Sequence, residues 1–138
     1  MTGPSATKLA VLLRDDLAVW QRLNVTAFLA SGIVGSRPEL LGEPYVDGDD
    51  TVYLPMLGQP VLVLVGDAAT VTNAHARAVA RQLPLTVFTE ELFGTGNDED
   101  NRAAVRAVSR AELRLVGIGV HGPRNAVDKV LKGSHLHP

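Results

Sequence analysis

The chain contains no cysteine, and this absence excludes several kinds of chemistry at once. Disulfide bonds, thiolate nucleophiles and cysteine-ligated zinc or iron–sulfur centres all require that side chain. Only four histidines are present, and the sequence shows neither a nucleophile elbow nor a phosphate-binding loop. We therefore expect no metal site and no cofactor.

Long apolar runs and an excess of positive charge are also missing. No run approaches the roughly 20 apolar residues of a membrane-spanning helix, and the N-terminal residues MTGPSAT do not resemble a signal peptide. The net charge of −2 argues against a protein that binds nucleic acid mainly by electrostatics. We expect a cytoplasmic protein with no membrane contact, and the preference for arginine over lysine hints at a bacterial, GC-rich genome.

The most informative stretch is residues 8–29, KLAVLLRDDLAVWQRLNVTAFL. Its apolar run, residues 9–13, predicts a buried strand. Three charged residues, 14–16, follow at once, and a helical pattern begins after them. A strand that ends in charge and leads into a helix places polar side chains at the carboxyl edge of a sheet, where open α/β folds bind ligands.

The helix of this stretch is expected over residues 18–31. Asp15 or Asp16 is its predicted N-cap, and Gly32 is its predicted stop. Apolar residues at three- and four-residue spacing predict its buried stripe. That stripe comprises Leu17, Trp20, Leu23 or Asn24, Ala27 and Phe28.

The rest of the chain alternates between predicted strands and helices. Further strands are expected at 61–66, 85–88 and 115–120, and further helices at about 67–83, 99–108 and 123–132. The run VLVLVG at 61–66 predicts a strand that is buried on both faces. This alternation predicts a single α/β domain over residues 1–138, folded as a three-layer α/β/α sandwich on a mainly parallel sheet.

Residues 37–60 interrupt the alternation with four prolines and three glycines. Two β-rich pieces flank the sequence DGDD at 47–50, and this pattern predicts a hairpin. An ordered insertion of this length is typical of a lid or of an interface. A surface excursion without a role is the alternative.

Polar residues cluster after the first and third predicted strands, where they can meet at one edge of the sheet. The candidate ligand-binding residues are Arg14, Asp15, Asp16, Asn24, Thr89, Glu90, Thr95 and Asn97. Two carboxylates at such an edge can share acid–base chemistry, so Asp16 and Glu90 are the candidates for a catalytic role. The alternative interpretation is that these residues serve only as helix caps and turns.

Two other patterns have simpler interpretations. Arginines recur every four residues at 102, 106, 110 and 114, but Ser109 interrupts the helical pattern and predicts two solvated faces rather than one basic stripe. Trp20 and Phe28 are interpreted as core or interface residues rather than as a stacking platform.

Two segments resemble type II peptidyl-tRNA hydrolases. Residues 8–17, KLAVLLRDDL, are similar to the opening strand of those enzymes, which also passes through an Arg-x-Asp-Leu step into a helix. Residues 115–133 are similar to their closing strand, Gly-Pro turn and helix with an Asp-Lys-Val-x-x-Gly pattern. Over nearly its whole length the chain also resembles a group of small bacterial proteins, classed as a domain of unknown function, that shares the type II hydrolase fold.

The resemblance implies a mixed sheet of four strands whose last strand is antiparallel to the others. It also implies a homodimer, because the hydrolases are often dimers. Their catalytic pattern does not carry over. Their first helix has Gly-Lys-x-Ala-Ala-Gln-x-x-His, whereas residues 21–29 read QRLNVTAFL, and their Asp-Ala-Gly-x-Thr segment corresponds to EELFGTG at 90–96.

These departures favour a small-molecule-binding or regulatory protein that holds a small polar ligand beneath the insertion. The first alternative is a hydrolase of peptidyl-tRNA or a related ester, although the missing lysine and histidine disfavour tRNA as a partner. The second alternative is a dimeric structural or partner protein that uses residues 37–60 as its interface. Fold alone does not decide between them.

Overall fold

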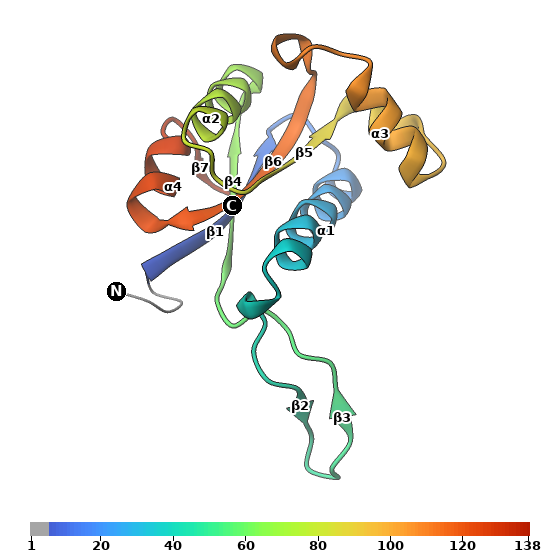
Figure 1. Ribbon diagram of the computed structural model, residues 1–138, viewed down its shortest axis with the longest axis vertical. Coiled ribbons are helices and arrows are strands. Elements are labelled where there is room, and N and C mark those ends of the chain that lie inside the picture. Colours follow the sequence, from blue (N-terminus) through green and yellow to red (C-terminus); the bar gives the residue numbers. More distant parts are fainter. Residues whose placement is uncertain (1–5) are drawn as a thin grey trace.

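The computed structural model describes residues 6–138, so most of the segment inspected for a signal peptide lies outside the described residues. Four α-helices and a five-stranded mixed sheet form the body of this region (Figure 1). The sheet consists of β1 (Thr7–Arg14), β4 (Val61–Gly66), β5 (Leu85–Thr89), β6 (Leu115–Pro123) and β7 (His135–Leu136). The helices are α1 (Val19–Ser36), α2 (Ala68–Ala80), α3 (Asp98–Arg106) and α4 (Arg124–Val130).

The strands lie in the order β5-β6-β1-β4-β7. β6 is antiparallel to both of its neighbours, as the resemblance implied, and β1 and β4 are the parallel pair of neighbours. The expectation of a mainly parallel sheet is wrong, because β6 and β7 run antiparallel to their neighbours. The prediction of four strands is also wrong, because the C-terminal residues add a fifth. Leu136 pairs with Leu64, which places β7 antiparallel on the outer edge of β4.

β1 supplies the centre of two cores, one on each face of the sheet. Ala10 and Leu12 pack with α2 and α4, whereas Val11 and Leu13 pack with α1. This follows from the period of two along a strand, which sends successive side chains to opposite faces. Each buried valine or leucine among them contributes roughly 1.5–3 kcal/mol through its removal from water.

β4 is less buried than its apolar sequence predicted. Only Val65 and Gly66 are buried, and the four residues before them are half-buried. The physical reason is that β4 lies next to the edge of the sheet: its outer neighbour, the edge strand β7, spans two residues and leaves most of β4 uncovered.

Both predicted ends of α1 are wrong. Ala18 is the N-cap, and its N–H donates to Oε1 of Gln21 at 2.9 Å, so neither aspartate takes that role. Gly32 lies inside the helix rather than at its end, where the absence of a side chain lets α1 approach Thr86 of β5. The helix continues to Ser36 and ends before Pro38. A residue that precedes a proline disfavours helical backbone geometry, because it clashes with the proline ring.

The buried stripe of α1 also differs from the prediction. Val25, Leu29 and Ile33 face the sheet, whereas Trp20 and Phe28 have 61% and 51% of their surfaces exposed. The two β6 glycines beneath α1, at 117 and 119, provide the space into which Val25 and Leu29 fit. α1 is apolar around most of its circumference, so these glycines, and not its periodicity, decide which face is buried.

The predicted hairpin is present, with β2 (Tyr45–Val46) antiparallel to β3 (Val52–Tyr53). It projects away from the sheet and the helices (Figure 1). β4 begins beside Leu9, at the opposite end of β1 from Arg14, so residues 37–60 lie at the opposite edge of the sheet from residues 14–16. The hairpin therefore does not cover the predicted ligand edge.

Two further structural features concern the described helices. α3 ends at Arg106, and Arg110 lies in a separate 3₁₀ turn, so the predicted break in the arginine series is confirmed.

Between residues 6 and 138, none of the helices has both the length and the apolar character needed to cross a bilayer.

Candidate functional site

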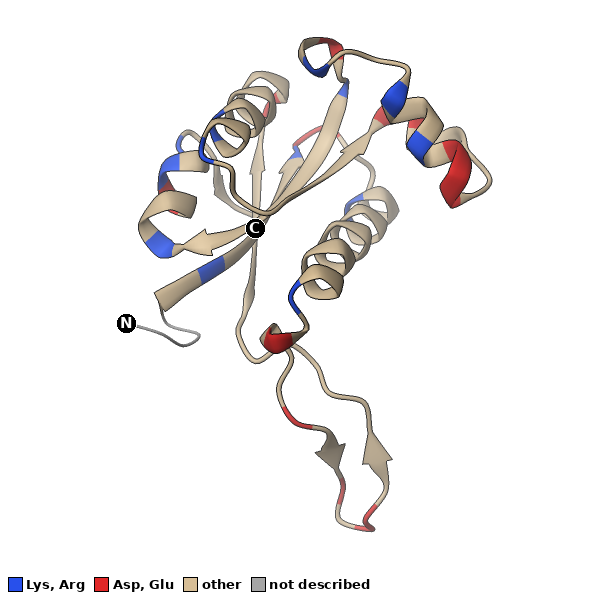
Figure 2. Cartoon of the chain, in the orientation of Figure 1, with Lys and Arg blue, Asp and Glu red and all other residues tan. Residues whose placement is uncertain are grey.

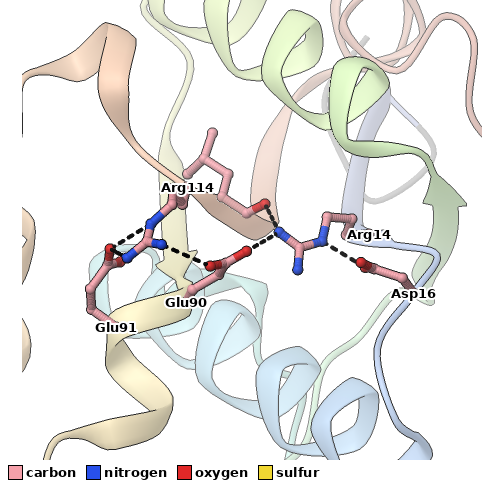
Figure 3. A network of polar contacts seen from close by, with 6 residues as sticks. Arg14, Asp16, Glu90, Glu91 and Arg114 are labelled. Carbon is pink, nitrogen blue, oxygen red and sulfur yellow. Dashed lines mark hydrogen bonds and ion pairs between the residues drawn. The ribbon is translucent and has the colours of Figure 1, made fainter.

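A network of ion pairs lies at the carboxyl end of β1 (Figure 3). Nε of Arg14 contacts Oδ1 of Asp16 at 2.6 Å, and its Nη1 contacts Oε1 of Glu90 at 2.7 Å. Arg114 lies on the other side of Glu90, at 3.5 Å, and donates two hydrogen bonds to Glu91, of 3.0 and 2.7 Å. Residues predicted from two distant segments are thus brought together here.

The charges of this network stabilise one another. Burial opposes the charged form of Arg14, but its hydrogen bonds to Asp16 and Glu90 raise the pKa of its guanidinium. The hydrogen bonds from Arg114 lower the pKa of Glu91, and that carboxylate in turn raises the pKa of Arg114. Arg14, Glu91 and Arg114 are therefore held in their charged forms near neutral pH.

The network fixes the 3₁₀ helix Glu90–Gly94 to the sheet. Glu90 anchors its first turn through Arg14, and its N–H donates to the carbonyl of Arg114 at 3.0 Å. The next residues of the same helix, Leu92 and Phe93, turn toward α1 and pack against the core of that face. The ion pairs therefore set the position of two apolar side chains outside the network.

Replacing Arg14 with alanine is expected to cost about 1–2 kcal/mol, because the side chain is only 16% exposed and Asp16 and Glu90 each lose a short ion pair. Arg114→Ala serves as the matched control and should change the stability far less, since that side chain is 64% exposed and its ion pairs are screened by solvent. Urea unfolding of the two variants measures this difference. An equal loss of unfolding free energy in the two variants would show that the ion pairs of Arg14 contribute no more than those of an exposed surface residue.

An aromatic groove lies beside this network, between α1, β5 and α3. Trp20 meets Phe93 edge-on, with ring centroids 5.9 Å apart, and Phe28 meets Phe88 edge-on at 5.8 Å. Phe88 and Phe93 are 5.0 Å apart and join the two pairs. The one tryptophan and all three phenylalanines of the chain therefore line one surface.

The groove consists of two adjoining cavities, of about 530 and 480 Å³. Both are lined by the same five side chains, namely Phe28, Phe88, Leu92, Asp98 and Asn101. Their combined size is in the range of small-molecule sites, which are mostly apolar with a few placed polar groups.

Polar groups from three elements form the rim of the groove. Asn97 caps α3 by accepting the N–H of Asp100 at 2.8 Å, and Thr95 is hydrogen bonded to Asn101. Asn24 is exposed on α1, and its amide makes no hydrogen bond with any residue between 6 and 138. That amide is thus available to a ligand as both donor and acceptor.

The structure therefore divides the predicted site residues into two groups. Asn24, Thr95 and Asn97 line the groove, whereas Arg14, Asp16 and Glu90 form the ion-pair network. Thr89 is buried at the end of β5, and Asp15 is exposed, with its backbone carbonyl accepting a hydrogen bond from Arg22. Neither lines the groove. The catalytic roles of Asp16 and Glu90 stay predictions.

Sequence reasoning missed the aromatic residues and Asn101. The sequence suggests a core or interface role for Trp20 and Phe28; both are more than half exposed, so neither is a core residue, and both line the groove. One indication was available: aromatic residues form only 4% of the chain, and four of the six converge here. Among the residues that the structure describes, no three His, Asp or Glu side chains gather as metal ligands.

The fold and the groove define a mixed α/β protein with helices on both faces of a five-stranded sheet. The chain matches the family described as protein of unknown function (DUF2000) over residues 7–138, and it belongs to that family. It is 45% identical to a solved structure of a protein of unknown function from Agrobacterium tumefaciens strain C58. The TM-score is 0.94, and the similarity covers 96% of this chain and 98% of that one. No curated protein matches the chain.

Proposed function

We propose that this chain is a small-molecule-binding protein whose ligand occupies the aromatic groove between α1, β5 and α3. The observation that carries the proposal is the convergence of Trp20, Phe28, Phe88 and Phe93 beside unused hydrogen-bonding capacity at Asn24. The proposal needs no catalytic group, and Arg14 serves as a positioning residue that holds the 3₁₀ helix of the groove wall.

The lining indicates an amphipathic ligand rather than the fully polar one expected from the sequence. A flat apolar body would pack edge-on or offset against the aromatic rings. Hydrogen-bonding groups of the ligand would face Asn24 and the Thr95–Asn101 pair at one end. At the other end, the cavity reaches Arg106, whose charge favours an anionic substituent.

The single tryptophan makes this proposal directly testable, because Trp20 lies in the groove. The probe is 1-anilinonaphthalene-8-sulfonate, an aromatic and largely apolar molecule with one anionic group. We expect saturable, one-site quenching of Trp20 fluorescence. Phe28→Asp should weaken this binding by about tenfold or more, equivalent to about 1.4 kcal/mol.

Leu136→Asp is the matched control, because Leu136 is an exposed apolar residue on β7 and does not line the groove. This variant should bind the probe as the wild type does, and circular dichroism should show that both variants fold. Unsaturable quenching, or equal binding by Phe28→Asp, would refute the groove as the site. Native mass spectrometry of protein purified from its own host then identifies a retained ligand.

We further propose that the sheet and its helices represent the type II peptidyl-tRNA hydrolase fold, and that the protein is bacterial and cytoplasmic. The antiparallel β6 between β1 and β5 supports the fold assignment. The hydrolase activity itself is not part of the proposal. Both candidate carboxylates, Asp16 and Glu90, contact Arg14, and the groove does not reach them.

A further inference from the structure

The hairpin exposes an unusual amount of apolar surface. We call residues 43–56 the arm. Its exposed large apolar side chains are Tyr45, Val46, Val52, Tyr53, Leu54 and Met56, each more than half exposed. Tyr45 lies opposite Tyr53, and Val46 lies opposite Val52, so both faces of the ribbon are apolar.

The arm has a defined shape although little supports it. The carboxylate of Asp47 accepts hydrogen bonds from Asp49 N, Thr51 N and Tyr53 Oη, at 2.9, 3.0 and 2.8 Å. Each strand nevertheless spans only two residues, and an isolated two-stranded ribbon is marginally stable in water. An organised turn with two apolar faces is typical of a segment that packs against a partner.

A second apolar surface lies on the outer face of α1. This helix has 18 residues, and Arg22 is the one charged residue among them (Figure 2). Val19, Trp20 and Leu23 are each more than 60% exposed. A solvent-facing helix normally carries charged or polar residues on its outer face, so this uncharged face is also typical of a contact surface.

We infer that the partner is a second copy of this chain, and that the arm of each copy packs on the α1 face of the other. Within one molecule the two surfaces do not meet, because the arm projects away from the helices (Figure 1). A twofold axis buries both surfaces of both copies at once, and such self-complementary contacts are the commonest oligomer interfaces.

The available area is sufficient for a stable dimer. The six arm residues and Val19, Trp20, Leu23 and Phe28 of α1 each leave roughly 100 Å² exposed, about half of what a large side chain offers. Together they present on the order of 1,000 Å² per protomer, and a standard interface buries about 800 Å² from each partner.

Charge is compatible with this arrangement. Residues 38–60 contain five carboxylates and no lysine or arginine, so the charged residues of this segment are all acidic (Figure 2). The three aspartates of the turn, at 47, 49 and 50, cluster at the tip, beyond the apolar pairs of the ribbon. They can stay at the solvated rim, while the uncharged α1 face receives the apolar part of the arm.

The arm of the second copy would also form the outer wall of the aromatic groove, because Trp20 and Phe28 belong to both surfaces. This last step rests on the proposed function. The dimer itself is measured without ligand, so the two ideas fail independently: a monomer that binds the probe refutes the dimer, and a dimer without saturable binding refutes the groove.

The cysteine-free chain allows a direct cross-linking test. A tagged Leu54→Cys protein is mixed with an untagged Leu23→Cys protein under mild oxidation. We expect a disulfide-linked heterodimer, because the arm of one copy lies on α1 of the other. Leu136→Cys, mixed with either protein, is the control and should give only background cross-linking, since its position lies on β7.

Sedimentation equilibrium supplies the second measurement. The wild type should be dimeric at micromolar concentration, and Leu54→Asp or Leu23→Asp should each weaken association by about tenfold or more, as expected for apolar interface residues. Both positions are largely exposed in the protomer, so folding is not at risk. A monomeric wild type, a dimer insensitive to both substitutions, or cross-linking no greater than in the control would overturn the inference.

Discussion

Gly119→Ala is expected to destabilise the protein by about 1–3 kcal/mol, the usual cost of adding a methyl group to a filled space. A Cβ at this position would lie 3.2 Å from the carbonyl oxygen of Leu29 and would collide with Oγ1 of Thr86. That hydroxyl donates to the Leu29 carbonyl at 2.9 Å and joins β5 to α1. The added methyl group therefore disrupts a hydrogen bond and pushes α1 away from the sheet.

Gly35→Ala is the matched control for this substitution. Gly35 lies in the last turn of α1, and no atom comes within 4 Å of a Cβ placed there. Alanine should increase stability by up to about 1 kcal/mol, because it has the higher helix propensity. Urea unfolding of both variants should thus give opposite signs. A neutral Gly119→Ala would show that α1 can move at no cost, and the groove would then have no fixed wall.

Lowering the pH from 7.5 to 5.5 is expected to destabilise the protein by up to about 2–3 kcal/mol, through His75 and His121. Both side chains are 7% exposed. Burial lowers the pKa of His75, and Arg110 lowers it further. Burial also lowers the pKa of His121, where Arg37 acts in the same direction and Glu39 opposes it.

The direction of this effect follows from proton uptake by the unfolded chain. Below about pH 6.5 the histidines of the unfolded chain bind protons, whereas burial lowers the pKa of the two imidazoles of the folded protein, which bind protons less readily. Stability is therefore highest above that pH and is lost as the pH falls, by at most about 1.4 kcal/mol per unit for each histidine. Nε2 of His121 is buried and has no hydrogen-bond partner among residues 6–138, so a charge there is especially costly.

The measurement is urea unfolding at pH 7.5 and 5.5 for the wild type and for the double variant His75→Gln/His121→Gln. The variant should lose most of the pH dependence, whatever its stability at pH 7.5. A pH dependence that survives both substitutions would contradict the assignment.

Local sequence determined the elements of this protein. The apolar run of β1, the helix after Asp67 and the hairpin around residues 47–50 all form where the pattern predicts them. These features depend on neighbours within a few residues, such as strand period, the Asp67 cap on Thr70 N, and the Asx hydrogen bonds of Asp47. The convergence of Arg14 and Glu90 was also predicted, because strand ends with a common direction share an edge of the sheet.

Packing between distant segments decided the rest. The periodicity of α1 could not identify its buried face, because apolar residues surround the helix and only the glycines of β6 select Val25 and Leu29. The aromatic groove joins residues 20 and 28 to residues 88 and 93, and no local pattern links them. The parallel pairing of β1 with β4 decides where the arm leaves the sheet, because it places the start of β4 at the opposite end of β1 from Arg14. Local sequence thus determined which elements form, and tertiary contacts determined which surfaces remain open to a ligand or a second copy.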